Sequence, residues 1–284
     1  MQLVELIVGS ILLLLLIIKM IQGKKYHDYV DNLDNDDYPL RSLYEIGLSW
    51  NDTKLLKLRG KIRYKLIGQA KLLYDEKYAE YYALITWSQV ISFVHIGLTF
   101  GFIFAGAFNA AFFILFGILF AFFTGYYFFT RMKEIIENRK NECVVELPEI
   151  VSTMALLINS GMILREAWKK ISESKDGEIY KLMQSASTNM RNGMSDADAI
   201  HRFGILSDSP DVKKFTSTLI QGLEKGNREL NLLLSKQSSE MWILKKQIML
   251  QKGEKAASKL LIPIALIFVG ILVIVISAAV GMLI

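Results

Sequence analysis

The sequence predicts an all-α fold with four transmembrane helices plus a cytoplasmic antiparallel bundle of about six helices. Three observations lead to this prediction. Four long apolar stretches are almost free of charge, basic residues gather beside their ends, and the charged remainder shows helical periodicity without strand-like alternation. Composition alone does not decide the class, because a globular chain of 284 residues can also reach 52% hydrophobic residues.

The apolar stretches are each long enough to cross a bilayer, which requires about 20 residues at about 1.5 Å of rise per residue. They cover residues 3–18, 87–107, 109–129 and 260–284. The first stretch has no basic segment before it and no small-residue cleavage site after Lys24 and Lys25. We therefore expect an uncleaved membrane anchor rather than a secretory signal.

Basic residues predict the orientation, because lysine and arginine are enriched on the cytoplasmic side of a membrane. They follow the first and third stretches and precede the fourth: Lys19, Lys24, Lys25, Arg131, Lys133, Lys245, Lys246, Lys252, Lys255 and Lys259. The turn at residues 106–109 carries no charge, as expected of a short outside loop. A multi-pass topology with both termini outside places all of these basic flanking residues on the cytoplasmic side.

This topology divides the chain into five parts. They are an anchor (1–22), a cytoplasmic linker with a basic amphipathic helix (23–85), a transmembrane hairpin (86–130), the cytoplasmic bundle (131–258) and a final transmembrane helix (259–284).

The linker opens with an acidic run, Asp31, Asp34, Asp36 and Asp37, which predicts a solvated segment. Asp34, Asp36 and Glu45 can be aligned with positions one, three and twelve of a calcium-binding loop. However, Tyr38 and Pro39 stand where that loop needs an oxygen ligand and a glycine.

From Lys54 the pattern becomes helical and continues through several tyrosines to the second apolar stretch. Its apolar residues are Leu55, Leu58, Ile62, Leu66 and Leu73. Two interpretations remain open: a helix at the membrane interface, where aromatic rings gather, or a helix packed on the second domain.

The bundle is predicted from periodic apolar stripes separated by glycines. Gly161, Gly193 and Gly226 each end one stripe and open the next, at intervals of 32 and 33 residues. Glycine adopts the left-handed conformation of a helix C′ position at little cost. Pro148 and Pro263 complete the expected helix-junction residues, and Pro263 is expected to kink the last span.

No local pattern predicts enzyme chemistry. The sequence lacks a phosphate-binding Gly-x-x-x-x-Gly-Lys-Ser/Thr loop, and His27, His95 and His201 are scattered. The lone Cys143 excludes an internal disulfide and a cysteine-rich zinc site. We expect no catalytic residue, cofactor or metal. The net charge of +5 is assigned to the membrane flanks rather than to a nucleic-acid partner.

A transporter is the alternative function. One face of the second span carries Ser88, Ser92, His95 and Thr99. A histidine within a membrane is a candidate for a substrate or proton path. Yet small and hydroxylated residues also join helices within membranes, and Gly97-x-x-x-Gly101 lies close by. We favour helix packing for this face.

Five short motifs carry a family resemblance. They are Leu147-Pro148-Glu149-Ile150, Leu156-Leu157-Ile158-Asn159-Ser160-Gly161-Met162, Ala167-Trp168, Gly193-Met194-Ser195-Asp196-Ala197 and Lys225-Gly226. Their order and spacing resemble the type II secretion F domain over roughly residues 145–284. This domain occurs in inner-membrane platform proteins of type II secretion and type IV pilus systems. A single such domain after two adjacent spans and an anchor is similar to the Tad (tight adherence) branch, TadC-like, with TadB-like proteins sharing the architecture.

The resemblance implies a non-enzymatic platform in the bacterial cytoplasmic membrane. Its implied partners are a hexameric secretion ATPase, a second, TadB-like platform subunit, pilin subunits and the lipid bilayer, in a homo- or hetero-oligomer. The candidate partner contacts are charged residues at the turns of the bundle: Arg165, Glu166, Arg191 and Arg228.

Overall fold

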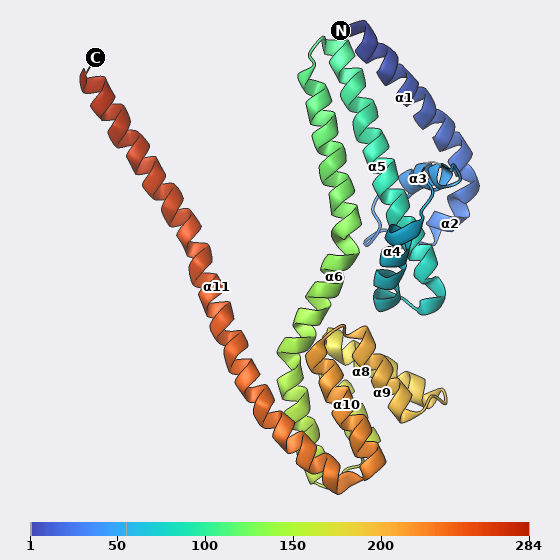
Figure 1. Cartoon of the computed structure of the whole chain (residues 1–284), viewed down its shortest axis with the longest axis vertical. Helices are drawn as coiled ribbons and strands as arrows, with labels where there is room; N and C mark the ends of the chain where they lie inside the picture. Colours follow the sequence, from blue (N-terminus) through green and yellow to red (C-terminus); the bar gives the residue numbers. More distant parts are fainter. Residues whose placement is uncertain (1, 55, 284) are drawn as a thin grey trace. The chain divides into compact units, whose positions relative to one another are not determined.

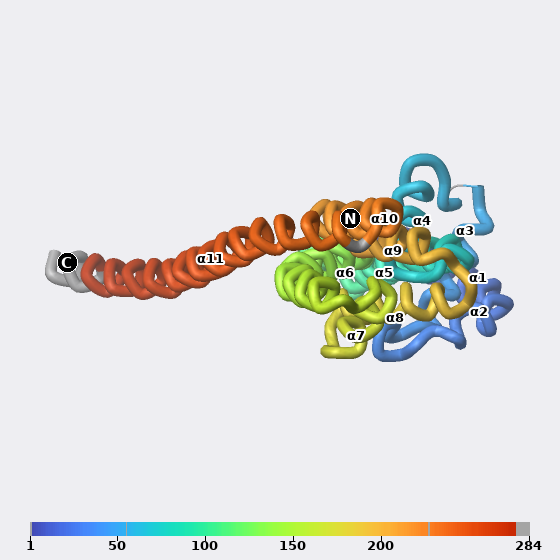
Figure 2. Tube along the Cα trace, turned by 90° about the horizontal axis from the view of Figure 1, so that it is seen from below, coloured from blue at the N-terminus to red at the C-terminus, as the bar shows by residue number. Residues whose placement is uncertain are grey.

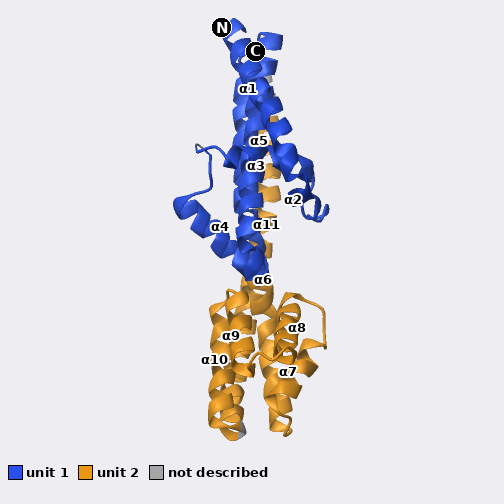
Figure 3. Ribbon diagram, turned by 90° about the vertical axis from the view of Figure 1, so that its right-hand side faces the viewer, with its two compact units in different colours: residues 1–139 blue, residues 140–284 orange. Residues whose placement is uncertain are grey.

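The computed structural model describes residues 2–54 and 56–283, and in this part of the chain every regular element is helical. This confirms the all-α prediction. Four helices are long and apolar enough to cross a membrane, also as predicted. They are α1 (Gln2–Gly23), α5 (Ala79–Phe108), α6 (Phe112–Asn159) and α11 (Asn227–Leu283). The chain divides into two compact units, Met1–Arg139 and Lys140–Ile284 (Figure 3).

In unit 1, α5 packs against α1 on one side and forms a hairpin with the first part of α6 (Figure 1). Small residues permit the close approach to α1: a Cβ on Gly106 would lie 2.6 Å from Leu6 Cγ. The hairpin turns at Asn109, which adopts a left-handed conformation with φ 52°. Asparagine tolerates this conformation better than most residues.

The segment after α1 is folded rather than a solvated linker, so that part of the prediction is wrong. It contains η1 (Lys24–Tyr26), α2 (His27–Asp31), η2 (Arg41–Leu43) and α3 (Tyr44–Asn51). Their apolar residues form a buried cluster with α5: Val30, Leu33, Tyr38, Tyr44, Leu48 and Ile85. The acidic residues between them are exposed. Helices this short give too few repeats for a periodic signal, and the charges conceal the buried positions.

The calcium-loop alignment has no counterpart in the structure. The Glu45 side chain is buried and bonds to His27 Nδ1 at 2.9 Å. Among the residues that the structure describes, no group of three potential metal ligands occurs.

The helix expected from Lys54 into the second span is interrupted. α4 (Gly60–Leu73) ends before Tyr74, and the chain reverses through η3 (Glu76–Tyr78) into α5. Leu66 and Ala70 are buried in two small clusters that α4 forms with α5 and α6 within unit 1. Tyr74 stacks on Tyr82 with ring centroids 3.5 Å apart, which joins the two sides of the reversal.

Unit 2 is a bundle of short helices on the ends of two long ones. Between the end of α6 and α11 lie α7 (Leu164–Ser172), α8 (Glu178–Arg191), α9 (Asp196–Leu206) and α10 (Pro210–Lys225). Trp168 is fully buried at the centre, donates its indole N–H to Met183 O at 3.1 Å and meets Phe203 edge-on at 5.0 Å. Figure 2 shows α11 extending away from the bundle as one continuous helix.

The glycine junctions have the geometry of helix ends. Gly161 has φ 94°, its N–H bonds to Ile158 O, and Met162 N–H bonds to Leu157 O. This is the Schellman pattern, in which a left-handed residue satisfies the last helical carbonyls. Gly193, with φ 95°, repeats the pattern at the end of α8, and Gly226, with φ 97°, separates α10 from α11.

The two prolines lie inside helices. α6 continues through Pro148, which is therefore not a junction, and α11 continues through Pro263. A proline removes one helical hydrogen bond, a loss that tertiary packing can offset. Leu147 and Ile150 on either side of Pro148 are both buried in the bundle core.

Candidate functional site

The polar face of α5 is covered by α3 and α1 in unit 1. Gly47 N–H donates to Ser92 Oγ at 2.9 Å. His95 accepts a hydrogen bond from Trp50 Nε1 at 3.0 Å, and its Nε2 lies 3.2 Å from Leu12 O. Ser92 and His95 therefore join helices, as favoured from the sequence, whereas the hydroxyls of Ser88 and Thr99 donate to carbonyls of α5 itself.

Lys19 has a specific role in this packing. Its side chain is buried, its Nζ donates to Ser49 O at 3.1 Å, and it lies 4.8 Å from the centre of the Trp50 ring. A cation at the last carbonyls of a helix is favourable because it opposes the negative end of the helix dipole. Lys19 thus caps α3 rather than acting only as a flanking charge.

The candidate partner-binding surface is a groove of about 620 Å³ between α7 and α8 in unit 2. It is lined by Ile163, Arg165, Glu166, Lys169, Ser172, Glu173, Gln184, Ser187, Thr188, Met190 and Arg191. The opposite face of α7 supplies Ala167, Trp168 and Ile171 to the core. The buried face therefore fixes which charges of α7 point into the groove.

Arg165 on α7 contacts both α8 and α9 at one end of the groove. Its Nη2 donates to Met190 O at 2.8 Å, and its Nε lies 3.5 Å from Asp196 Oδ1. Met190 O belongs to the last turn of α8, and Asp196 begins α9. The guanidinium thus sits between the negative end of one helix dipole and an acidic first turn.

Two further contacts define the groove walls. Gln184 Nε2 on α8 donates to Ser172 O at the end of α7 at 2.8 Å. Arg191 Nη2 donates to Thr188 Oγ1 at 3.1 Å on the same helix. The side chains that form the walls are thus anchored by hydrogen bonds, while the charged ends of Glu166, Lys169 and Glu173 belong to exposed residues.

Three of the four candidate contacts come together in this groove. Arg165, Glu166 and Arg191 line it, whereas Arg228 lies on α11 and does not. Sequence reasoning missed Lys169 and Glu173. Their signal is the spacing of Glu166, Lys169 and Glu173 at i, i+3 and i+7, which places them on one helical face.

A concave surface of mixed charge with a basic excess is one on which a protein partner can dock. Three basic residues face two acidic ones: Arg165, Lys169 and Arg191 against Glu166 and Glu173. The fold is that of a multi-pass helical membrane protein with a helical domain that carries a charged groove.

The comparison with protein families agrees with this class. Residues 150–283 match the model of the family "Type II secretion system (T2SS), protein F", so this part of the chain carries that family's domain. The match begins within α6 and ends at the last residue of α11. The chain shows no significant similarity to curated proteins or to solved structures.

Proposed function

We propose that the chain is a non-enzymatic platform protein of a Tad-type or related pilus or secretion machine in the bacterial cytoplasmic membrane. In this proposal it couples a hexameric cytoplasmic ATPase to the extraction of pilin subunits and to filament assembly. A second platform subunit and further copies of the chain complete the assembly, and both termini lie outside.

The observation that carries the proposal is the continuity of α11. This helix runs unbroken over 57 residues, from Asn227 in the bundle to the apolar end of the chain. Leu230, Leu234 and Met241 are buried in the bundle core. A push on the bundle can therefore tilt or rotate an apolar span without crossing a loop, which is a rigid-body mechanism of transmission.

The charged groove supports the same proposal. It gives the ATPase a surface next to the core that anchors α11, and its exposed charges favour rapid, orientation-specific association. The platform needs no nucleotide site of its own if the partner binds ATP.

The test uses the full-length chain in nanodiscs, immobilised, with the secretion ATPase encoded nearby as analyte in its nucleotide-free, ADP and ATP states. We expect binding that depends on the nucleotide, and no ATP hydrolysis by the chain alone. An absence of binding in all three states, or hydrolysis by the chain itself, would overturn the proposal.

A further inference from the structure

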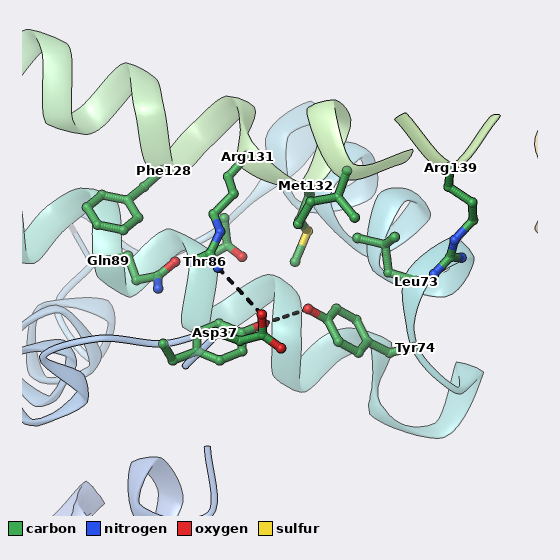
Figure 4. Close-up of a pocket in the computed structure, with 11 residues that line it drawn as sticks. Asp37, Leu73, Tyr74, Thr86, Gln89, Phe128, Arg131, Met132 and Arg139 are labelled. Carbon is green, nitrogen blue, oxygen red and sulfur yellow. Dashed lines mark hydrogen bonds and ion pairs between the residues drawn. The ribbon is translucent and has the colours of Figure 1, made fainter. Parts of the chain in front are cut away.

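A cavity of about 190 Å³ lies inside unit 1, where α6 leaves its apolar stretch (Figure 4). Its polar wall includes Tyr38, Tyr74, Thr86, Gln89, Arg131 and Arg139. Its apolar wall is formed by Leu73, Phe128, Met132 and Ile135. The cavity is separate from the α7–α8 groove and lies outside the residues matched by the family.

Arg131 supplies a largely buried positive charge to this cavity. Its side chain is 23% exposed, and its counter-charge is Asp37, at 3.9 Å and with a side chain that is 75% exposed. The ion pair is therefore long and partly in solvent. A guanidinium carries five N–H donors in a planar fork, which suits two oxygens of a phosphate group.

Gln89 brings an unsatisfied donor to the same place. It is 2% exposed, and its side-chain nitrogen makes no hydrogen bond of normal geometry among the described residues, with the Tyr44 hydroxyl as a close polar neighbour. A buried donor without a partner is costly, so such a group in a cavity indicates a missing ligand or water. Thr86 lies nearby on the same helix, and its hydroxyl donates to Tyr82 O at 3.0 Å.

The two tyrosines add neutral hydroxyls. Tyr38 and Tyr74 share a hydrogen bond of 2.6 Å. Burial raises the pKa of both phenols, so neither becomes an anion that would repel another anion at neutral pH. Of the two arginines that line the cavity, Arg139 donates to Leu72 O at 2.7 Å, and Arg131 is the one that pairs with Asp37.

The polar wall of the cavity lies near the end of a predicted membrane span. Arg131 follows the apolar stretch that ends at Phe129 by two residues, the level at which lipid headgroups meet a span. Basic pockets between transmembrane helices bind anionic headgroups. We propose that this cavity binds a phosphate ester, held by Arg131 and Gln89, and its apolar wall favours an anionic phospholipid as the source.

The first test compares the full-length chain in nanodiscs of phosphatidylcholine with and without phosphatidylglycerol, with the retained lipid counted by native mass spectrometry. We expect preferential retention of phosphatidylglycerol. Arg131→Gln should lower this retention about tenfold, because a charge-assisted bidentate contact is lost. Lys133→Gln is the matched control. This substitution removes the same charge from the same helix, but Lys133 does not line the cavity. Equal losses in the two variants would overturn the proposal.

A second variant separates ligand binding from a structural role of Arg131. Asp37→Asn breaks the same ion pair but removes a competing negative charge, so it should strengthen lipid retention while Arg131→Gln weakens it. If the two variants change retention in the same direction, Arg131 serves only its ion pair with Asp37 and the proposal fails. Thermal unfolding of both variants shows whether either has lost its fold, and Arg131→Lys, which keeps the charge, should restore part of the binding.

The source of the phosphate is distinguished with inorganic phosphate and glycerol 3-phosphate as competitors. If neither displaces the lipid, the phospholipid source stands. If the soluble phosphates bind to the delipidated chain through Arg131 and no lipid is retained, the phosphate site stands and its lipid source is wrong. If neither lipid nor phosphate binds, the cavity is not an anion site.

Discussion

Gly101 and Gly117 meet across α5 and α6 with their backbones in direct contact. A Cβ on Gly101 would lie 2.7 Å from Gly117 Cα, and a Cβ on Gly117 would lie 2.6 Å from Gly101 Cα. Gly97 extends the contact one turn along α5, where its Cβ would lie 3.2 Å from Ala121 N. Small residues on facing helices allow this approach, and in a membrane the resulting van der Waals contact drives helix association.

Gly101→Leu should therefore separate the two helices. The side chain has no room, and overpacking of a well-packed contact costs about 1–3 kcal/mol. We expect a lower unfolding temperature of the full-length chain in detergent and faster proteolysis of the hairpin. Gly270→Leu is the control, because Gly270 also lies in an apolar span but has no atom within 4 Å of its Cβ position. Similar losses in both variants would contradict the close contact.

Gly161→Val tests the junction between α6 and α7. The Cβ position at Gly161 is open, so the cost comes from the backbone conformation at φ 94° and not from a clash. A β-branched residue in this region costs on the order of 1–2 kcal/mol. The unfolding temperature of the full-length chain should fall, as measured by circular dichroism. Gly161→Asn should lower the unfolding temperature less, since asparagine tolerates the left-handed region. An unchanged Gly161→Val variant would show that the junction adapts.

The helix junctions could be predicted from the sequence because their signals are local. A glycine after a periodic stretch and a serine before the next one determine their own turn, and Ser195 Oγ accepts the N–H of Asp198 at 3.1 Å as a helix cap. The packing of α3 could not be predicted in this way. It depends on Gly47 meeting Ser92, residues 45 positions apart in the chain, and on Lys19 reaching Ser49 from another helix.

The proposed orientation predicts opposite labelling at two introduced cysteines. Ala107→Cys, at the exposed turn of the hairpin, should react with a membrane-impermeant thiol reagent in intact cells. Asn141→Cys, which is exposed on α6 beyond the basic flank, should react only after the membrane is opened. The native Cys143 cannot report this, because it is fully buried in the bundle core, and Cys143→Ala provides the background. The reverse pattern would invert the topology.

The candidate site was only partly predictable. Arg165 and Glu166 follow a glycine junction, and Arg191 precedes one, so all three could be placed at the turns. The same reasoning placed Arg228 beside Gly226, but Arg228 is not among the residues that line the α7–α8 groove. Which turns adjoin one another depends on the bundle topology, and no periodic pattern in a single sequence encodes it.

Lys169 and Lys170 form a matched pair for testing the groove. Both are exposed neighbours on α7, yet only Lys169 lines the groove. Lys169→Glu changes the excess of basic over acidic groove residues into a deficit, whereas Lys170→Glu alters the total charge of the chain equally but leaves the groove unchanged. We expect Lys169→Glu to weaken binding of the partner ATPase several-fold, about 1 kcal/mol, mainly through slower association.

The same experiment is repeated at several salt concentrations to measure how the association rate depends on salt. Charges are screened over about 8 Å at physiological ionic strength, so association of the wild-type chain should slow as salt is raised. Lys169→Glu should make association less sensitive to salt, because it removes an attractive charge from the contact, while Lys170→Glu should keep the wild-type slope. Surface plasmon resonance with the full-length chain in nanodiscs measures both quantities. If the two variants behave alike, the effect is one of total charge, and the ATPase contacts a surface other than the α7–α8 groove.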